Sequence, residues 1–301
     1  DGCLLGPALG SRRGKSTFFE LFNVLLPLAF DYKLTGSEEA RDAALLLFDY
    51  AADQGWAEGS GRGNMFLNIL IFAAYCHALY LMRDELARTG RLDHHMRAAR
   101  WYLCFGKAFR AFDTPEQETN TDEQRSIVFT SLPVLLAMPE SPRQLQYLQS
   151  WRDWLQNALY ISPKFAGMIK PDGSGWHHRG VYTVCYTGEA YELAAVAAYM
   201  LHDTSYALDE WARDNLAYAL RTEFEMSFNR EMPFALRGRM PGGTYDPDSA
   251  GWYAMCAAFG FLSMASEKHQ QDLGVIFSRL WDPSLPAHDT ALRLNLFNHF
   301  P

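Results

Sequence analysis

The chain repeats one pattern that strongly restricts its fold: an apolar helical segment, a short break, and an amphipathic helical segment. The first copy fills residues 17–54 with a break at Leu34–Ser37, and the pattern recurs around breaks at Pro139–Pro142 and His202–Thr204. A ring of helical hairpins requires this alternation, with apolar helices inside and one-sided helices outside. Strand signals are scarce, and the unit has no fixed length as a short-period solenoid would. The sequence therefore predicts an all-α protein, a toroid of helix pairs.

Composition and charge exclude several classes of partner. The 301 residues are 49% hydrophobic and 21% charged, which is typical of a globular protein of one large domain or two. A net charge of -8 argues against a general surface for nucleic acids or anionic membranes. The longest apolar runs, such as Ile69–Ala74, are far shorter than the roughly 20 residues of a spanning helix. We expect neither a nucleic acid nor a membrane as a partner.

Motifs for cofactors are incomplete or absent. The segment Gly10–Ser16 imitates a phosphate-binding loop, but three residues separate its glycines where the motif needs four. No histidine has a partner at zinc-ligand spacing, and neither HExxH nor CxxC occurs. The five cysteines do not indicate a disulfide framework. The sequence predicts no metal and no cofactor.

Polar and glycine-rich segments separate the hairpins, and loops on a rigid scaffold are where function is expected. These segments span residues 59–64, 113–125, 170–186 and 230–248. Lys170–Tyr186 turns at Pro171–Gly173 and brings histidines, an arginine and tyrosines to the entrance of an apolar helix predicted over Glu189–Leu201. The last segment adds Arg237 and Arg239, whose guanidinium groups suit carboxylate or sulfate ligands. A purely structural role, in which the rings plug one end of the toroid, stays open.

The sequence KPDGSGWHHRGVYTVCY at residues 170–186, the His-Asp-Thr break and a later Gly-Arg-Met-Pro segment resemble chondroitin sulfate ABC lyases. The run Leu47–Ser60 also fits their pattern, and the resemblance covers about Phe19 to Gly260. It implies a secreted or periplasmic polysaccharide lyase that cleaves uronate-containing glycosaminoglycans by β-elimination to 4,5-unsaturated products. Chondroitin and dermatan sulfate are the implied substrates, with hyaluronan as a further candidate. The implied fold is an incomplete (α/α) toroid.

The resemblance also implies roles for individual residues. His178 resembles the catalytic histidine and Tyr186 the catalytic tyrosine. Arg239 resembles the arginine of a Gly-Arg loop, and Asn120 the asparagine of another loop. The residues implied in substrate binding are His177, Tyr182, Arg237, Arg179, Lys170, Trp176 and Asn64. Compared with the family pattern, the spacing from His178 to Tyr186 is one residue longer, so Tyr182 stays an alternative catalytic phenol.

Domain organisation and one part of the cleft depart from the family. The segment Gly63–Phe66 stands where ABC lyases have a His-His-Trp sequence, so part of the substrate cleft is expected to differ. Residues 1–281 are predicted to form the catalytic toroid. The tail, residues 282–301, contains prolines and is predicted to be a linker toward a β-sandwich domain that this chain lacks. The expected partners are therefore an acidic polysaccharide and β-sandwich domains of the same full-length protein, and the piece alone is expected to act slowly or not at all.

The chemistry of β-elimination accounts for these residue types. Removal of the uronate C5 proton needs neutralisation of the adjacent carboxylate, by arginine, asparagine or protonated histidine. A histidine or tyrosine can then take the proton, and an acid can protonate the leaving oxygen. Two alternatives stay open because fold does not decide function: a glycoside hydrolase that uses a carboxylate pair, and a glycosaminoglycan-binding scaffold without turnover.

Overall fold

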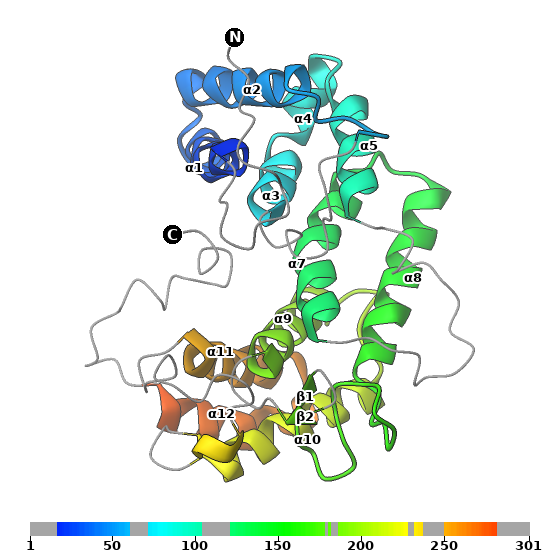
Figure 1. Ribbon diagram of the computed structural model, residues 1–301, viewed down its shortest axis with the longest axis vertical. Coiled ribbons are helices and arrows are strands. Elements are labelled where there is room, and N and C mark those ends of the chain that lie inside the picture. Colours follow the sequence, from blue (N-terminus) through cyan, green and yellow to red (C-terminus); the bar gives the residue numbers. More distant parts are fainter. Residues whose placement is uncertain are drawn as a thin grey trace. The chain divides into compact units, whose positions relative to one another are not determined.

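The structure, a computed structural model, describes residues 17–60, 72–103, 121–177, 180–181, 186–227, 232–236 and 250–281 (Figure 1). The chain divides into two compact units, each described by itself. Unit 1 comprises residues 1–109 and 129–147, and unit 2 comprises residues 110–128 and 148–299. Nearly all regular structure in the described ranges is helical, which confirms the predicted all-α class. None of the described helices is long and apolar enough to span a membrane.

Unit 1 opens with the predicted hairpin. Its helices are α1 (Thr17–Thr35), α2 (Glu38–Asp53), α3 (Ala73–Leu81), α4 (Arg83–Arg88) and α5 (Leu92–Tyr102). The break predicted at Leu34–Ser37 is confirmed: Gly36 adopts a positive φ of 75°, and the Ser37 hydroxyl caps α2 by accepting from the Ala40 N–H at 3.2 Å. Helix α1 packs against both α2 and α3.

Aromatic rings fill the core of unit 1. Trp56 stacks on Tyr102 with ring centroids 4.0 Å apart, and Phe22 lies 4.9 Å from Tyr75. The Tyr75 hydroxyl lies 2.9 Å from Nδ1 of the buried His95. Such aromatic pairs each add about 0.5–1.5 kcal/mol beyond the burial of their surface, so these rings fix how the unit 1 helices pack.

Helices α7 (Thr121–Ala137) and α8 (Pro142–Ala158) flank the predicted break at Pro139–Pro142, which is confirmed. The expectation of a loop over residues 113–125 is wrong for its last five residues, which form the first turn of α7. Asp122 and Glu123 stand in that turn, where the helix dipole favours negative charge.

Unit 2 contains the second set of helices and a small hairpin. Its elements are β1 (Trp176–His177), β2 (Gly180–Val181), α9 (Tyr186–Leu201), α10 (Glu210–Met226), the 3-10 turn η3 (Phe234–Leu236), α11 (Ala250–Ala265), the 3-10 turn η4 (Glu267–His269) and α12 (Gln270–Leu280). Helix α11 packs against α9, α10 and α12 (Figure 1). The apolar helix predicted from Glu189 begins three residues earlier, so Tyr186 belongs to the first turn of α9 and not to the preceding loop.

Candidate functional site

A compact turn and a short hairpin position the residues before α9. Gly173 has a positive φ of 78°, and the Asp172 carboxylate accepts hydrogen bonds from the N–H and hydroxyl of Ser174 at 3.0 and 2.7 Å. These bonds lower the pKa of Asp172 below its ordinary value. In the hairpin that follows, Trp176 pairs with Val181 and His177 with Gly180.

The hairpin brings His177 against Tyr186. The two rings are stacked, with centroids 4.3 Å apart and an angle of 16° between their planes. Both residues are buried, with 2% of His177 and 8% of Tyr186 exposed. The hairpin and the first turn of α9 are thus joined through the two rings.

Two residues in the first turn of α7 lie close to the ring nitrogens of His177. The Thr121 hydroxyl lies 2.6 Å from Nδ1, and an Asp122 carboxylate oxygen lies 3.4 Å from Nε2. A hydroxyl that donates to Nδ1 leaves the imidazole proton on Nε2, which faces the Asp122 carboxylate. Asp122 thereby favours one orientation of the imidazole.

Arg125 occupies the centre of this cluster. Its Nη2 lies 2.7 Å from Asp122, its Nη1 pairs with Glu189 on α9, and its guanidinium carbon lies 5.1 Å from the centre of the Tyr186 ring. Two carboxylates therefore compensate one guanidinium, and all three side chains are at most 16% exposed. Arg125 is thus fully engaged by groups within the cluster.

A buried carboxyl supports the start of α9. Glu223 on α10 is fully buried, and its Oε1 accepts a hydrogen bond of 2.7 Å from the hydroxyl of Thr187, also fully buried. Burial raises the pKa of Glu223 well above its ordinary value of 4.5, and the hydrogen bond from Thr187 opposes this only in part. Burial therefore favours the uncharged form of this carboxyl.

Lys170 and Trp176 lie in the same loop. The Lys170 ammonium donates to the backbone carbonyls of Lys164 and, at 2.6 Å, of Ala166, and it lies 5.0 Å from the centre of the Trp176 ring. Only 5% of Lys170 is exposed. Phe165 is 72% exposed, and its ring centroid lies 6.4 Å from that of Trp176. These contacts give Lys170 a structural role, and its role in substrate binding stays a prediction.

The structure brings together two of the predicted site residues, His177 and Tyr186, and places Lys170 and Trp176 in the loop before them. The others lie outside the described residues: His178, Arg239, Asn120, Tyr182, Arg237, Arg179 and Asn64.

Sequence reasoning missed Thr121, Asp122, Arg125, Thr187 and Glu223. Only the spacing of Asp122 and Arg125, three residues apart at a helix start, is a local signal that could have found any of them. Glu223 stands in an ordinary amphipathic helix, where a charged residue normally indicates a solvated face.

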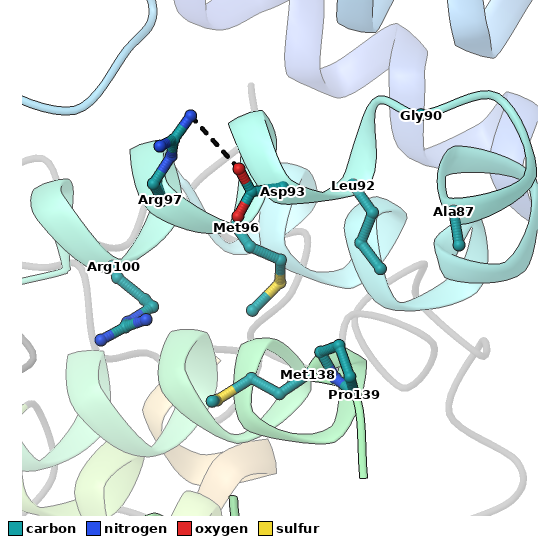
Figure 2. Close-up of a pocket in the computed structure, with 9 residues that line it drawn as sticks. All are labelled: Ala87, Gly90, Leu92, Asp93, Met96, Arg97, Arg100, Met138 and Pro139. Carbon is teal, nitrogen blue, oxygen red and sulfur yellow. Dashed lines mark ion pairs between the residues drawn. The ribbon is translucent and has the colours of Figure 1, made fainter. Parts of the chain in front are cut away.

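Unit 1 contains a separate pocket of about 320 Å³. Its lining residues, drawn in Figure 2, are Ala87, Gly90, Leu92, Asp93, Met96, Arg97, Arg100, Met138 and Pro139. Arg97 pairs with Asp93 at 3.2 Å (Figure 2). Of the predicted site residues that the structure describes, none lines this pocket. Within the described ranges, no three histidine, cysteine or carboxylate groups come together as metal ligands.

Sequence comparison relates the chain to known enzymes. The family model described as "Lyase, catalytic" matches residues 12–284. A chondroitin sulfate ABC exolyase of Bacteroides thetaiotaomicron is 28% identical over 232 residues, which cover 75% of this chain and 22% of that protein. A chondroitin sulfate ABC endolyase of Proteus vulgaris is 24% identical over 280 residues, or 88% of this chain and 27% of that protein. The predicted resemblance is confirmed, and the chain spans about a quarter of the length of these curated relatives.

Solved structures share the fold. A xanthan lyase of Paenibacillus matches with a TM-score of 0.66 and 16% identity, over 92% of this chain and 26% of that one. The chondroitin AC lyase of Streptomyces coelicolor A3, solved in complex with chondroitin sulphate, matches with a TM-score of 0.61 and 16% identity, over 86% and 36% of the two chains. At this identity the likeness concerns the fold alone, and it agrees with the predicted class of helical hairpins.

Proposed function

The chain belongs to the family described as "Lyase, catalytic", and we propose that it is the catalytic helical domain of a polysaccharide lyase acting on glycosaminoglycans. Chondroitin and dermatan sulfate are the proposed substrates, with hyaluronan as a further candidate. The observation that carries the proposal is the stacked pair of His177 and Tyr186, held by the first turn of α7 beside the hairpin whose sequence resembles the lyase motif.

The proposed reaction is β-elimination at a uronate. A base removes the C5 proton, the C4=C5 double bond forms, and the bond from C4 to the leaving oxygen breaks as an acid protonates that oxygen. We assign the proton transfers to the Tyr186 phenol and the His178 imidazole, with Tyr182 as the alternative phenol. A positioned group of this kind contributes roughly 10²–10⁴-fold to the rate.

We propose that His177 supports the reaction indirectly, by positioning Tyr186. Its side chain has no exposed surface, so it is suited to holding Tyr186 and not to contacting a polymer. His177 and Thr121 are also the chain neighbours of two proposed catalytic residues, His178 and Asn120. The anchored backbone at both positions therefore supports the assignment of the flanking residues.

The substrate carboxylate needs a cation that is not already paired. Arg125 is compensated by Asp122 and Glu189. On the resemblance to the family, Arg239 with Asn120 is the proposed neutralising pair. Arg179 and Arg237 are proposed to hold further acidic groups, because a chain of net charge -8 attracts a polyanion only locally. The half-buried Trp176 and exposed Phe165 offer apolar ring faces to sugars.

The biological setting forms part of the proposal. We propose secretion or a periplasmic location, since an extracellular polysaccharide must be reached, and β-sandwich domains as partners within the full-length protein. The relatives, about four times as long as the matched segment, are consistent with such additional domains.

Product spectroscopy tests the reaction type. The protein, together with its proposed β-sandwich domains, is incubated separately with chondroitin sulfate, dermatan sulfate and hyaluronan, and both ultraviolet absorbance of the conjugated double bond and new reducing ends are measured. Elimination yields both signals, hydrolysis yields reducing ends alone, and a binding scaffold yields neither. Either of the last two outcomes with all three polymers contradicts the proposal.

A matched pair of variants tests the site. Tyr186→Phe removes only the phenolic oxygen and is expected to abolish the absorbance signal. Tyr199→Phe is the control, because Tyr199 stands on the same helix and stacks on His202 in a similar way, with centroids 5.5 Å apart and planes at 13°, but is 37% exposed. Loss in Tyr182→Phe with full activity in Tyr186→Phe would transfer the role to Tyr182.

A further inference from the structure

Thr187 is a buried junction between three elements of unit 2. It follows Tyr186 in the first turn of α9, and its hydroxyl donates to Glu223 on α10 at 2.7 Å. It also packs tightly on Gly175: a Cβ atom at Gly175 would lie only 2.6–2.8 Å from three side-chain atoms of Thr187. Thr187 therefore contacts the strand entry and α10 at once.

The position of Thr187 couples the two stacked rings. Gly175 lies two residues before His177, and Thr187 lies one residue after Tyr186. A β-branched side chain has few accessible rotamers, and a partner for its hydroxyl selects among them. Rotation or displacement of Thr187 would push on Gly175 and change the distance between β1 and the start of α9.

Glu223 is the hydrogen-bond partner of the Thr187 hydroxyl, and its surroundings are unusual for a carboxyl group. No ion pair of the described residues includes Glu223, and its Oε2 makes no hydrogen bond there. A buried carboxylate without a cation is costly, so the group is held as a carboxylic acid. The acid still presents Oε1 as an acceptor to the Thr187 hydroxyl.

We propose that Glu223 is a positioning residue of the lyase site: its hydrogen bond holds Thr187 against Gly175 and thereby sets Tyr186 relative to His177. The inference rests on the proposed function for its kinetic consequences, whereas its geometric content is independent of activity. Displacement of a catalytic group by about 1 Å can cost on the order of 10²-fold in rate. The hydrogen bond between Glu223 and Thr187 can therefore affect kcat through the position of Tyr186, although it does not touch the reacting atoms.

The kinetic test separates hydrogen bonding from charge. Glu223→Gln keeps an acceptor oxygen and the uncharged state, so kcat and its pH profile are expected to stay within about three-fold of the parent from about pH 5 to about pH 8. Glu223→Leu and Thr187→Val remove the two ends of the bond and are each expected to lower kcat at least about ten-fold with little change in KM. Thr187→Ser restores the hydroxyl and is expected to recover most of kcat.

The double variant and a neighbouring threonine provide controls. Glu223→Leu combined with Thr187→Val is expected to be no slower than either single variant, because both remove one interaction. Thr222→Val is the matched control: Thr222 adjoins Glu223 on α10 and packs on Gly173, but its hydroxyl donates to its own helix, to the Tyr218 carbonyl. Its kcat is expected to stay unchanged.

A spectroscopic readout distinguishes failure of this inference from failure of the proposed function. The His177 ring protons lie over the Tyr186 ring, and nuclear magnetic resonance reports their ring-current shift whether or not the protein cleaves a polymer. Thr187→Val and Glu223→Leu are expected to change that shift, and Thr187→Ser, Glu223→Gln and Thr222→Val to preserve it. An unchanged ring-current shift in Thr187→Val would overturn the inference. A double variant whose fold-loss of kcat equals the product of the losses in the two single variants would overturn it as well. A parent protein that forms no double bond when tested with its proposed β-sandwich domains would contradict the function alone.

Discussion

The imidazole of His177 and the phenol ring of Tyr186 lie nearly parallel, with centroids 4.3 Å apart and 16° between their planes. This contact joins a two-residue strand to the first turn of a helix, and each ring has a further partner: Thr121 for the imidazole and Arg125 for the phenol. The candidate site is thus held by stacking and by charge from three segments of unit 2.

Truncation of His177 should disturb Tyr186 directly. His177→Ala opens a buried cavity and is expected to lower the free energy of unfolding by about 2–4 kcal/mol and to reduce kcat strongly. His202→Ala removes the exposed half of the comparable Tyr199 stack and is expected to change stability by less than about 0.5 kcal/mol. Chemical denaturation measures the free energy of unfolding, and the double-bond assay measures kcat. Equal stability losses in the two variants would show that the buried stack contributes no more to stability than the Tyr199 stack.

Arg125→Lys should weaken the bridge between α7 and α9. A lysine places one point charge where the guanidinium reaches Asp122, Glu189 and the Tyr186 ring together, and we expect a stability loss of about 1–3 kcal/mol with reduced kcat. Arg152→Lys is the control, because the carboxylates that Arg152 contacts are about half exposed. Denaturation midpoints of the two variants should differ clearly.

Glu223 should make stability depend on pH above its ordinary value of 4.5. The folded-state pKa is raised, so above about pH 4.5 the unfolded chain releases this proton while the folded chain retains it, and the group's contribution falls by up to ~1.4 kcal/mol per pH unit until the folded-state pKa is passed. Glu223→Gln removes this term, so its stability relative to the parent should increase as pH rises. A difference that is constant with pH would show that the carboxyl is charged in the folded protein.

The buried His95 and the half-buried His77 should limit acid stability in unit 1. Burial lowers the pKa of His77 to about 4 and that of His95 to about 3, so the unfolded chain binds these protons first as pH falls below 6.5. Stability is therefore fully present above about pH 6.5 and declines as pH falls toward 4 and 3. His95 is further influenced by His94, Asp49 and Arg91, and His95→Gln should flatten the decline by up to ~1.4 kcal/mol per pH unit.

Lys170→Met should destabilise the loop that carries the hairpin. The ammonium satisfies two backbone carbonyls, and their loss of a donor is expected to cost about 1–3 kcal/mol. Lys164→Met changes an exposed lysine in the same loop and should be nearly neutral. An unchanged stability for Lys170→Met, together with a higher KM that no longer depends on salt, would instead assign Lys170 to substrate binding.

Local sequence patterns were sufficient to predict several helices and the breaks between them, and to propose the segment where the site lies. Period-3.6 apolar spacing and local turn residues predict α1, α2 and the break before α8, because these depend on neighbours in the chain. The order of residues in Lys170–Tyr186 also identified the lyase resemblance and, with it, Tyr186.

The side chains that support that segment became apparent from the packing of the helices alone. Thr121 and Arg125 lie 56 and 64 residues from His177 and Glu189, and Thr187 lies 36 residues from Glu223. No periodicity encodes such pairings, because they arise when α7, α9, α10 and the hairpin pack. The same burial raises the pKa of Glu223: a glutamate on an amphipathic helix is charged in water, and removal of that water by the packed elements favours its uncharged form.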